Sequence, residues 1–379
     1  MNDELAPEII FLQNEKYFDA LLRDIDQAKM QIDLETYIFE GDALGLQVLD
    51  SLIAAANRGV KVRILVDGAG TGVWSADLER KLEAAGIETR VYHPFPWRFW
   101  QWRRAIVRLP FLRKILFFIY MMNKRNHRKV CVIDGDIVYI GSANISQCHL
   151  SVQQGGKGWR DTVVRLRSVD ITDLNEAFEA AWNHTSFSDH LHNLFERVNT
   201  GAVIRLNYTR HRRRSFYKNL LRHIAKCKTR VWITNAYFVP DNFLLKKLKD
   251  LAESGVDVRI LLPQKADVFI MSWASSAFYE SLLNSGVRIF EYFPSMLHAK
   301  SLILDDWFVV GSSNFNHRSV LHDLEVDVTI TDTKNKQIIE QQFIVDLSQS
   351  QEIDLSSWHK RTWFQKWIGR LTLYVKYWI

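Results

Sequence analysis

HRKVCVIDGDIVYIGSAN, at residues 127–144, and HAKSLILDDWFVVGSSN, at residues 298–314, spell one motif twice in the same chain. Each copy contains H-x-K-x(4)-D and is followed by G-S-x-N. Taken separately, an H-x-K on a strand is usually a half-exposed polar face, and G-S-x-N is usually a turn. Finding both pieces twice, in the same order, is far harder to explain by chance. The doubled motif therefore predicts one site that is assembled from two halves.

Strand geometry should bring the polar residues of each copy together. The apolar runs at 130–133 and 301–304 are typical of β-strands, in which residues i and i+2 point to the same face. Each histidine should then share a face with the lysine two positions on, and a short turn should return the asparagine beside them. Histidine can act as a nucleophile or an acid near neutral pH, and lysine stabilises an anion. The pattern therefore indicates phosphoryl transfer.

An internal repeat extends beyond the motif. Residues 31–67 and 229–263 each read as an apolar strand, an amphipathic helix and a second strand. A further helix, at about 75–86 and about 267–285, and then a further strand precede each H-x-K segment. We therefore predict an α/β fold with two similar halves, each a mixed β-sheet flanked by helices, and an active site at their pseudo-twofold interface.

The chain has 379 residues, which is enough for two domains. We place the N-terminal domain at 1–195 and the C-terminal domain at 196–379. The polar stretch around 186–203 is the predicted linker between them.

The chain resembles the phospholipase D superfamily, and most closely its bacterial cardiolipin synthases. The resemblance is carried by HRKVCVID with GSAN, HAKSLILD with GSSNFNHRS, the YIFEGD and YFVPD starts, and the RGVKVRILVDG run. It covers roughly residues 8–345. The doubled motif is strongly specific for the superfamily, whereas the narrower assignment is less so, because nucleases and other lipid-modifying members share the motif.

The resemblance implies a covalent mechanism. One histidine attacks phosphorus to form a phosphohistidine, and the other protonates the leaving alkoxide and then deprotonates the incoming hydroxyl. By analogy with the family we expect His127 to be the nucleophile and His298 the acid and base. Lys129 and Lys300 would stabilise the charge on the phosphoryl oxygens. No metal and no cofactor is expected, since the lysines supply fixed positive charge.

Further residues of the expected site follow from the same resemblance. The family pattern groups the motif aspartates with the catalytic set, although we expect them to be structural or cross-dimer hydrogen-bond partners rather than bases: Asp134 and Asp305. Acidic residues downstream of each motif should orient the histidines, although a surface carboxylate is an equal alternative for either one alone: Asp161 and Glu325. The predicted phosphate-binding residues are Asn144, Asn314, Ser142 and Ser312.

The first half carries an insertion before its motif. Gly59 and His127 are 68 positions apart, whereas Gly255 and His298 are 43 apart, so about 25 residues are extra. They coincide with the basic aromatic segment 93–125, where Pro110 should split a helix. This segment fits the headgroup layer of a membrane, and the alternative is a buried helical hairpin that covers the core. The predicted lipid contacts here are Trp97, Trp100, Trp102, Phe117 and Phe118.

The C-terminal segment 358–379 repeats this composition, with basic residues, tryptophans and no acid. Trp363 and Trp367 are predicted lipid contacts there, and the alternative is a last helix packed on the domain. The basic stretch 210–214 could contact lipid phosphates or be a solvated helix start. A formal net charge of +6 also favours an anionic membrane surface as a partner.

The expected partners are phospholipid substrates and an anionic membrane surface. No nucleic acid is expected to bind, and the sequence does not determine the oligomeric state. The expected location is the bacterial inner membrane, peripherally and on the cytoplasmic side. The three cysteines are too few and too scattered for a disulfide or metal framework. The expected reaction converts two phosphatidylglycerols into cardiolipin and glycerol. A hydrolytic phospholipase D, a nuclease of the same superfamily and a non-enzymatic membrane adaptor are the alternatives.

Overall fold

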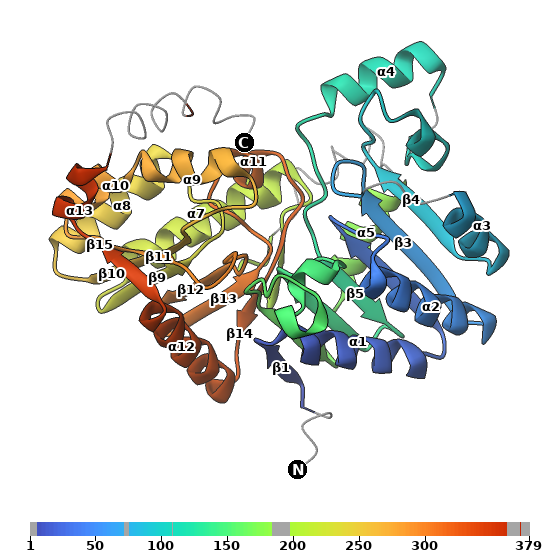
Figure 1. Ribbon diagram of the computed structural model, residues 1–379, viewed down its shortest axis with the longest axis horizontal. Helices are drawn as coiled ribbons and strands as arrows, with labels where there is room; N and C mark the ends of the chain where they lie inside the picture. The colour runs from blue at the N-terminus through green and yellow to red at the C-terminus, as the bar shows by residue number, and fades with distance from the viewer. Residues whose placement is uncertain (1–5, 72–75, 108, 184–197, 362–371, 373–379) are drawn as a thin grey trace.

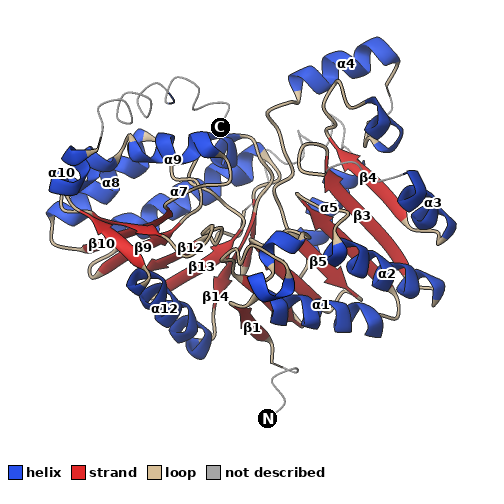
Figure 2. Cartoon of the chain, in the orientation of Figure 1, coloured by secondary structure: helices blue, strands red, loops and turns tan. Residues whose placement is uncertain are grey.

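The computed structural model describes residues 6–71, 76–107, 109–183, 198–361 and 372. Two β-sheets lie side by side in it, and helices flank each of them (Figures 1 and 2). The predicted α/β architecture with two similar halves is confirmed. The proposed boundary between residues 195 and 196 lies outside the described residues.

The sheet of the first half is mixed, with strand order β1-β7-β6-β5-β2-β3-β4. Strands β2, β3 and β4 run parallel, as a βαβ repeat requires, and the others pair antiparallel. The strands are β1 (Glu8–Phe11), β2 (Gln31–Thr36), β3 (Lys61–Asp67), β4 (Glu88–Tyr92), β5 (Val130–Ile133), β6 (Ile137–Gly141) and β7 (Val163–Arg167). The helices are α1 (Asn14–Gln27), α2 (Ala43–Asn57), α3 (Ala76–Ala84), α4 (Phe111–Tyr120) and α5 (Thr172–Asn183), with short 3₁₀ turns η2 (Phe99–Arg104), η3 (Gln147–His149) and η4 (Val152–Gln154).

The second half repeats this order, and β15 adds one further edge strand: β15-β11-β10-β9-β12-β13-β14-β8. Its strands are β8 (Ile204–Leu206), β9 (Arg230–Thr234), β10 (Asp257–Pro263), β11 (Arg288–Tyr292), β12 (Ser301–Leu304), β13 (Trp307–Gly311), β14 (Val326–Ile330) and β15 (Ser350–Ile353). Its helices are α7 (Arg210–Lys226), α8 (Asn242–Glu253), α9 (Phe269–Ser276), α10 (Tyr279–Asn284), α11 (His317–Leu321), α12 (Thr333–Ser348) and α13 (Leu355–Lys360). The single helix expected at 267–285 is in fact the pair α9 and α10.

The two βαβ units begin their helices in the same way. Asp42 accepts a hydrogen bond from the Gly45 amide at the start of α2, and Asp241 accepts one from the Leu244 amide at the start of α8. These side chains satisfy backbone donors that a helix leaves unpaired in its first turn. The equivalent caps show that the sequence repeat is also a repeat of local structure.

The two sheets share one apolar core where they meet. Val130 and Val164 of the first half pack in the same cluster as Phe308, Val310 and Val326 of the second. Two parallel bridges cross the same boundary, joining Asn126 to Leu324 and Arg160 to Leu297. This seam therefore holds the residues that precede β5 and β12 against the opposite half.

The insertion of the first half stands at the edge of the molecule. Pro110 lies at the N-terminal cap of α4, so the predicted split into helical pieces is confirmed. Trp97 and Trp100 are exposed, at 57% and 53% of their full surface. The expectation that Phe118 contacts lipid is wrong, because it is fully buried and packs edge-on against Trp102.

The remaining predicted lipid contacts differ among themselves. Phe117 and Trp102 are half-buried, with Phe117 packed against His93 and Trp102 packed against Phe111. Trp363 and Trp367 lie outside the described residues. Within the described part of the chain, no helix combines the length and the apolar character needed to cross a membrane.

Candidate active site

The histidine of each motif is held by a carboxylate of the other half. Nδ1 of His127 lies 3.1 and 3.0 Å from the two carboxylate oxygens of Glu325. Nδ1 of His298 lies 2.8 Å from Oδ1 of Asp161. All four side chains are buried. With Nδ1 committed to a carboxylate, Nε2 of each ring remains for chemistry, which is the orientation that an activated histidine needs.

Main-chain hydrogen bonds across the seam fix this exchange. The His127 amide donates to the Leu324 carbonyl at 2.9 Å, and the His298 amide donates to the Arg160 carbonyl at 2.8 Å. Each histidine is thereby bonded to the residue that immediately precedes the orienting carboxylate of the opposite half. The sequence predicted Asp161 and Glu325 as orienting residues, but it did not reveal that each one serves the distant motif.

The serines of the two G-S-x-N segments bind these carboxylates. Ser142 Oγ donates to Asp161 Oδ1 at 2.7 Å, and Ser312 Oγ donates to Glu325. Each serine oxygen also accepts a backbone N–H, from Thr162 or from Val326. The prediction that Ser142 and Ser312 bind phosphate is therefore wrong, because both hydroxyl protons point at a carboxylate.

The two lysines converge on the same place from the two halves. Lys129 Nζ donates to the His127 carbonyl at 2.7 Å, and Lys300 Nζ donates to the His298 carbonyl at 2.6 Å. Burial, reinforced by the charge of Lys300, lowers the pKa of Lys129 well below its usual value. Burial also lowers the pKa of Lys300 to about 8, against the attraction of Asp161 and Glu325. Two buried cations this close favour an anionic ligand.

This environment lowers the pKa of both motif imidazoles. Burial is the largest cause for His127, and the charges of Lys129 and Lys300 lower its pKa further. For His298, burial and Lys300 lower the pKa to about 3 and outweigh the attraction of Asp161. A phosphodiester between the lysines would add negative charge, which favours protonation of one ring.

The two orienting carboxylates are electrostatically different. Burial raises the pKa of Glu325 to about 7, although Lys129 and two serine hydroxyls oppose this. Burial acts on Asp161 in the same direction, but His149 and His298 outweigh it and hold the pKa well below the usual value. Asp161 is therefore ionised throughout the neutral range, whereas Glu325 titrates within it.

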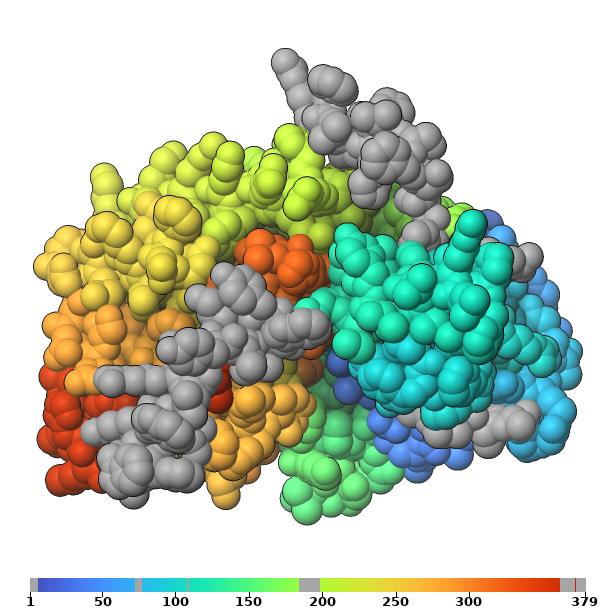
Figure 3. Space-filling view, turned by 90° about the horizontal axis from the view of Figure 1, so that it is seen from above, coloured from blue at the N-terminus to red at the C-terminus, as the bar shows by residue number. Residues whose placement is uncertain are grey.

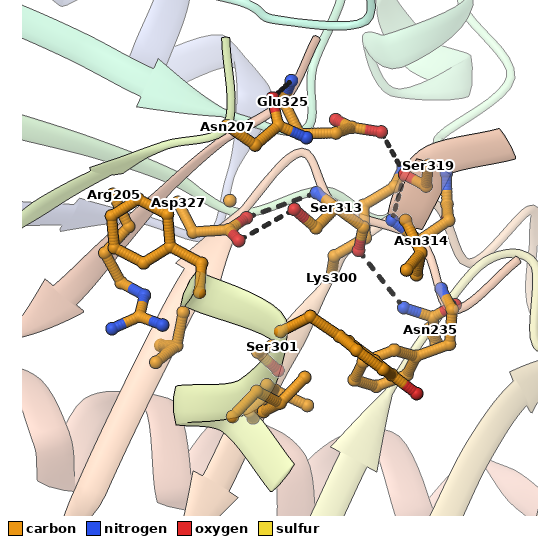
Figure 4. A pocket seen from close by; sticks show the side chains of 18 of the residues that line it. Arg205, Asn207, Asn235, Lys300, Ser301, Ser313, Asn314, Ser319, Glu325 and Asp327 are labelled. Carbon is orange, nitrogen blue, oxygen red and sulfur yellow. Dashed lines mark hydrogen bonds between the residues drawn. The ribbon is translucent and has the colours of Figure 1, made fainter. Parts of the chain in front are cut away.

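The asparagines are buried beside these groups. Asn144 Oδ1 accepts the Ile38 amide at 3.2 Å, so one of its polar atoms is already used. Oδ1 of Asn314 is buried and has no hydrogen-bond partner among the described residues. Asn314 also lines a cavity of about 90 Å³ together with Lys300 and Glu325 (Figure 4). This cavity has room for a few water molecules.

The motif aspartates do not touch this site. Asp134 accepts the amides of Lys29, Met30 and Gln31 at the far end of β5. Asp305 accepts the amides of Lys228, Thr229 and Arg230 at the far end of β12. Both aspartates have a positive φ, 52° and 49°, in the turn that follows each strand. Grouping Asp134 and Asp305 with the catalytic residues is therefore wrong, and the structural reading, with partners inside the chain, is the right one.

One residue of the site has no counterpart in the sequence-based prediction. His149 is buried in η3, and its Nδ1 lies 2.6 Å from Asp161 Oδ2. Among the described residues, His149, Asp161 and His298 form a group that could hold a metal ion by proximity. Each imidazole instead sits at hydrogen-bond distance from its own oxygen of Asp161, so a cation would have to displace both bonds.

Most of the chain is similar to known proteins. Residues 21–182 and 220–347 match the family described as "Cardiolipin synthase, PLD-like domain". A cardiolipin synthase of Clostridium perfringens strain SM101 is 32% identical over 365 residues, which cover 91% of this chain and 72% of the relative. A cardiolipin synthase of Staphylococcus aureus strain Mu50 is 31% identical over 361 residues, which cover 93% of this chain and 69% of the relative.

Two solved structures share the fold. The phosphatidylserine synthase of Haemophilus influenzae Rd KW20 superposes with a TM-score of 0.70 at 14% identity, covering 98% of this chain and 95% of that one. The polyphosphate kinase of Porphyromonas gingivalis superposes with a TM-score of 0.59 at 12% identity, covering 90% of this chain and 50% of that one. At these identities the likeness concerns the fold alone.

Proposed function

The chain belongs to the cardiolipin synthase family of phospholipase D-like proteins, and from this premise we propose that it transfers a phosphatidyl group from one phosphatidylglycerol to another, giving cardiolipin and glycerol. One observation carries the proposal. Two buried histidines, one from each half, are each held at Nδ1 by a carboxylate of the other half, beside two buried lysines. This arrangement suits a phosphodiester that is attacked on one side and released on the other.

The first chemical step forms a phosphohistidine. Nε2 of His127 attacks the phosphorus of the first phosphatidylglycerol, and the bond from phosphorus to the glycerol oxygen breaks. His298 donates a proton to that oxygen, so that neutral glycerol leaves. Glu325 keeps the remaining proton of His127 on Nδ1 and balances the positive charge that develops on the ring.

The second step reverses the first with a different alcohol. His298, now neutral, takes the proton from a glycerol hydroxyl of the second phosphatidylglycerol. The alkoxide attacks phosphorus, the bond from phosphorus to His127 breaks, and cardiolipin forms. One phosphodiester replaces another, so the reaction needs no nucleotide. Lys129 and Lys300 stabilise the added negative charge in both steps. The open Oδ1 of Asn314 is an acceptor suited to an alcohol hydroxyl.

The exposed apolar face of the insertion is the proposed route to lipid. Leu112, Leu116 and Tyr120 of α4 are exposed at 74%, 66% and 74%. On the same side of the molecule, α4 stands beside α11 and the first turns of α7 (Figure 3). Apolar side chains next to basic ones fit the interface of an anionic bilayer. We therefore place the enzyme peripherally on the bacterial inner membrane, on its cytoplasmic side, with Trp97 and Trp100 among the contacts.

Basic residues of the segment that follows α4 and of the first turn of α7 act on one another electrostatically. Burial lowers the pKa of Lys124, and the charges of Arg213 and Arg210 lower it further. These arginines lie in the first turn of α7, which contains no acidic residue, at the end of a helix that favours negative charge. Nearby lipid phosphates would relieve this mutual repulsion. Arg212 of the basic stretch 210–214 is buried and paired with Asp173, so the proposed phosphate contacts are the exposed Arg210 and Arg214.

The test of the reaction is mass spectrometry of lipids after incubation of the purified protein with phosphatidylglycerol vesicles. Cardiolipin and glycerol are expected in equal amounts from the parent, with neither formed by His127→Ala or His298→Ala. Phosphatidic acid in place of cardiolipin would show a hydrolase instead. Cleavage of DNA with no lipid turnover would show a nuclease, and vesicle binding without turnover would show an adaptor.

The membrane contact has its own test. Leu112→Glu with Leu116→Glu should reduce co-flotation with phosphatidylglycerol vesicles at least tenfold. The matched control is Ile338→Glu with Ile344→Glu, because these residues of α12 are also exposed and α12 lies on the opposite side of the molecule from α4 (Figure 1). Equal flotation of the two variants would contradict the proposed contact.

A further inference from the structure

His149 completes a chain of hydrogen bonds that begins at a backbone amide. Nε2 of His149 accepts the N–H of Asn144 at 3.2 Å, and Nδ1 donates to Asp161 Oδ2 at 2.6 Å. The other oxygen of Asp161 accepts from His298. His149 therefore connects the G-S-x-N turn of the first half to the carboxylate that orients His298.

The second half builds the same connection from a different residue. Ser319 Oγ accepts the N–H of Asn314 at 2.9 Å and donates to Glu325 Oε1. Glu325 in turn accepts from His127. His149 and Ser319 each stand five residues after the asparagine that donates to them. A long imidazole is matched with the shorter carboxylate of aspartate, and a short hydroxyl is matched with the longer carboxylate of glutamate.

We propose that His149 is a positioning residue of the phosphatidyl transfer, which fixes Asp161 for His298 as Ser319 fixes Glu325 for His127. This inference rests on the proposed function and adds to it a residue outside both motifs. Asp161 also accepts hydrogen bonds from Ser142 and, at 3.4 Å, from Asn14. Without His149, its Oδ2 would keep only the long bond from Asn14, and the carboxylate could rotate away from the His298 ring.

The hydrogen bonds define the form of the ring. Burial lowers the pKa of His149, but Asp161 outweighs this effect and raises it to about 9. A proton on Nε2 would point at the Asn144 N–H, whereas a neutral ring accepts that N–H and still donates from Nδ1. Asp161 favours a second proton on the ring and the Asn144 N–H opposes it, and we take the hydrogen-bond geometry to decide for the neutral ring. A side chain that accepts the Asn144 N–H and donates to Asp161 could therefore replace His149.

Four variants test the inference, with kcat and KM measured on phosphatidylglycerol. His149→Ala should lower kcat roughly 10- to 100-fold and change KM less than twofold, since loss of a residue that orients a reacting group acts on the reaction more than on binding. His149→Gln should keep most of the activity, because its amide both accepts and donates. His149→Ser alone should fail like alanine, since a hydroxyl does not span the gap to aspartate. His149→Ser with Asp161→Glu, which copies the second half, should recover at least tenfold over His149→Ser.

The outcomes separate positioning from a general structural role. Equal kcat losses in all four variants, following their melting temperatures, would overturn the inference, and so would His149→Ala with kcat within twofold of the parent. Should His149→Ala not fold, His149→Gln and the double variant decide the question. Failure of the proposed function would appear in the parent itself, as a different lipid product, whereas failure of this inference appears only in the variants.

Discussion

Nδ1 of His298 lies 2.8 Å from Oδ1 of Asp161, although 137 positions separate the two residues and they belong to different halves. His127 and Glu325 form the reciprocal pair across 198 positions. The two pairs lie at one seam, where the motif segments are bridged to the opposite half. The proposed catalysis therefore depends on the contact between the halves as much as on either motif.

Asp161→Asn should disable His298 without displacing it. The amide can still sit beside the ring, but it offers an N–H where the carboxylate offered a lone pair, which favours the wrong tautomer of His298. We expect kcat to fall by about 10³ to 10⁴ with little change in KM, by analogy with aspartate-to-asparagine changes in Ser-His-Asp sites. Steady-state kinetics on phosphatidylglycerol vesicles measures the effect. Asp306→Asn, at an exposed turn, is the control and should leave kcat unchanged.

The pH dependence of kcat/KM should be bell-shaped and narrow. The pKa of Glu325 is raised to about 7, so the carboxylate that holds His127 is lost as the pH falls through that value. The pKa of Lys300 is lowered to about 8, so its positive charge is lost as the pH rises through that value. Glu325 should contribute to the acid limb and Lys300 to the alkaline limb, because kcat/KM reports groups of the free enzyme. In Lys300→Arg, any residual activity should lack the alkaline limb. An alkaline limb that stays in place would assign it to another group.

Lys300→Met should stabilise the protein while it abolishes transfer. The pKa of Lys300 falls from 10.5 in the unfolded chain to about 8 in the fold, so the buried charge opposes folding below about pH 8. Removing that charge should raise the free energy of unfolding at pH 7 by about 1–3 kcal/mol, given about 1.4 kcal/mol per pKa unit. This stabilisation should shrink as the pH rises from 8 to 10.5, because in that range Lys300 of the parent is already neutral in the folded protein. Urea unfolding at pH 7 and pH 10 measures it, and a destabilised variant at pH 7 would contradict the argument.

Asp305→Asn should reduce stability and spare the chemistry. Asp305 binds three backbone amides and the Thr229 hydroxyl, and their hydrogen bonds lower its pKa to about 2 against the effect of burial. Weakening these bonds should cost roughly 1–3 kcal/mol, with kcat within about twofold of the parent. Because the pKa is lowered, this contribution is present above the unfolded pKa and should fade as the pH falls from about 4 to about 2. A large loss of kcat at unchanged stability would return Asp305 to the catalytic set.

The fold could be predicted because the same pattern of elements occurs twice in the sequence. The repeat of strand, helix and strand at 31–67 and 229–263 gives each half independent support, and β2, α2 and β3 fall within the first of these ranges. The histidines and lysines were identifiable because H-x-K and G-S-x-N occur together twice, in the same order. The internal repeat was therefore enough to predict the architecture and the residue types of the site.

The pairing within the site could not be predicted, because it arises from contacts between distant segments. Nothing near Glu325 in the sequence indicates that its partner is His127 rather than His298. Ser142 has the residue type of a phosphate ligand, but only the fold shows that its hydroxyl faces Asp161. Phe118 belongs to an apolar run whose inward and outward faces depend on where α4 packs.

The exchange of carboxylates also restricts how a lipid can arrive. If the halves parted to admit substrate, His127 and His298 would each lose the carboxylate that holds them, and the apolar core shared by the two sheets would open to water. In this separated state neither histidine would be oriented for catalysis, and exposure of the apolar core would raise the free energy of the protein. In the proposed reaction, lipids therefore reach the site while the two halves stay together, and a covalent cross-link across the seam should leave turnover intact.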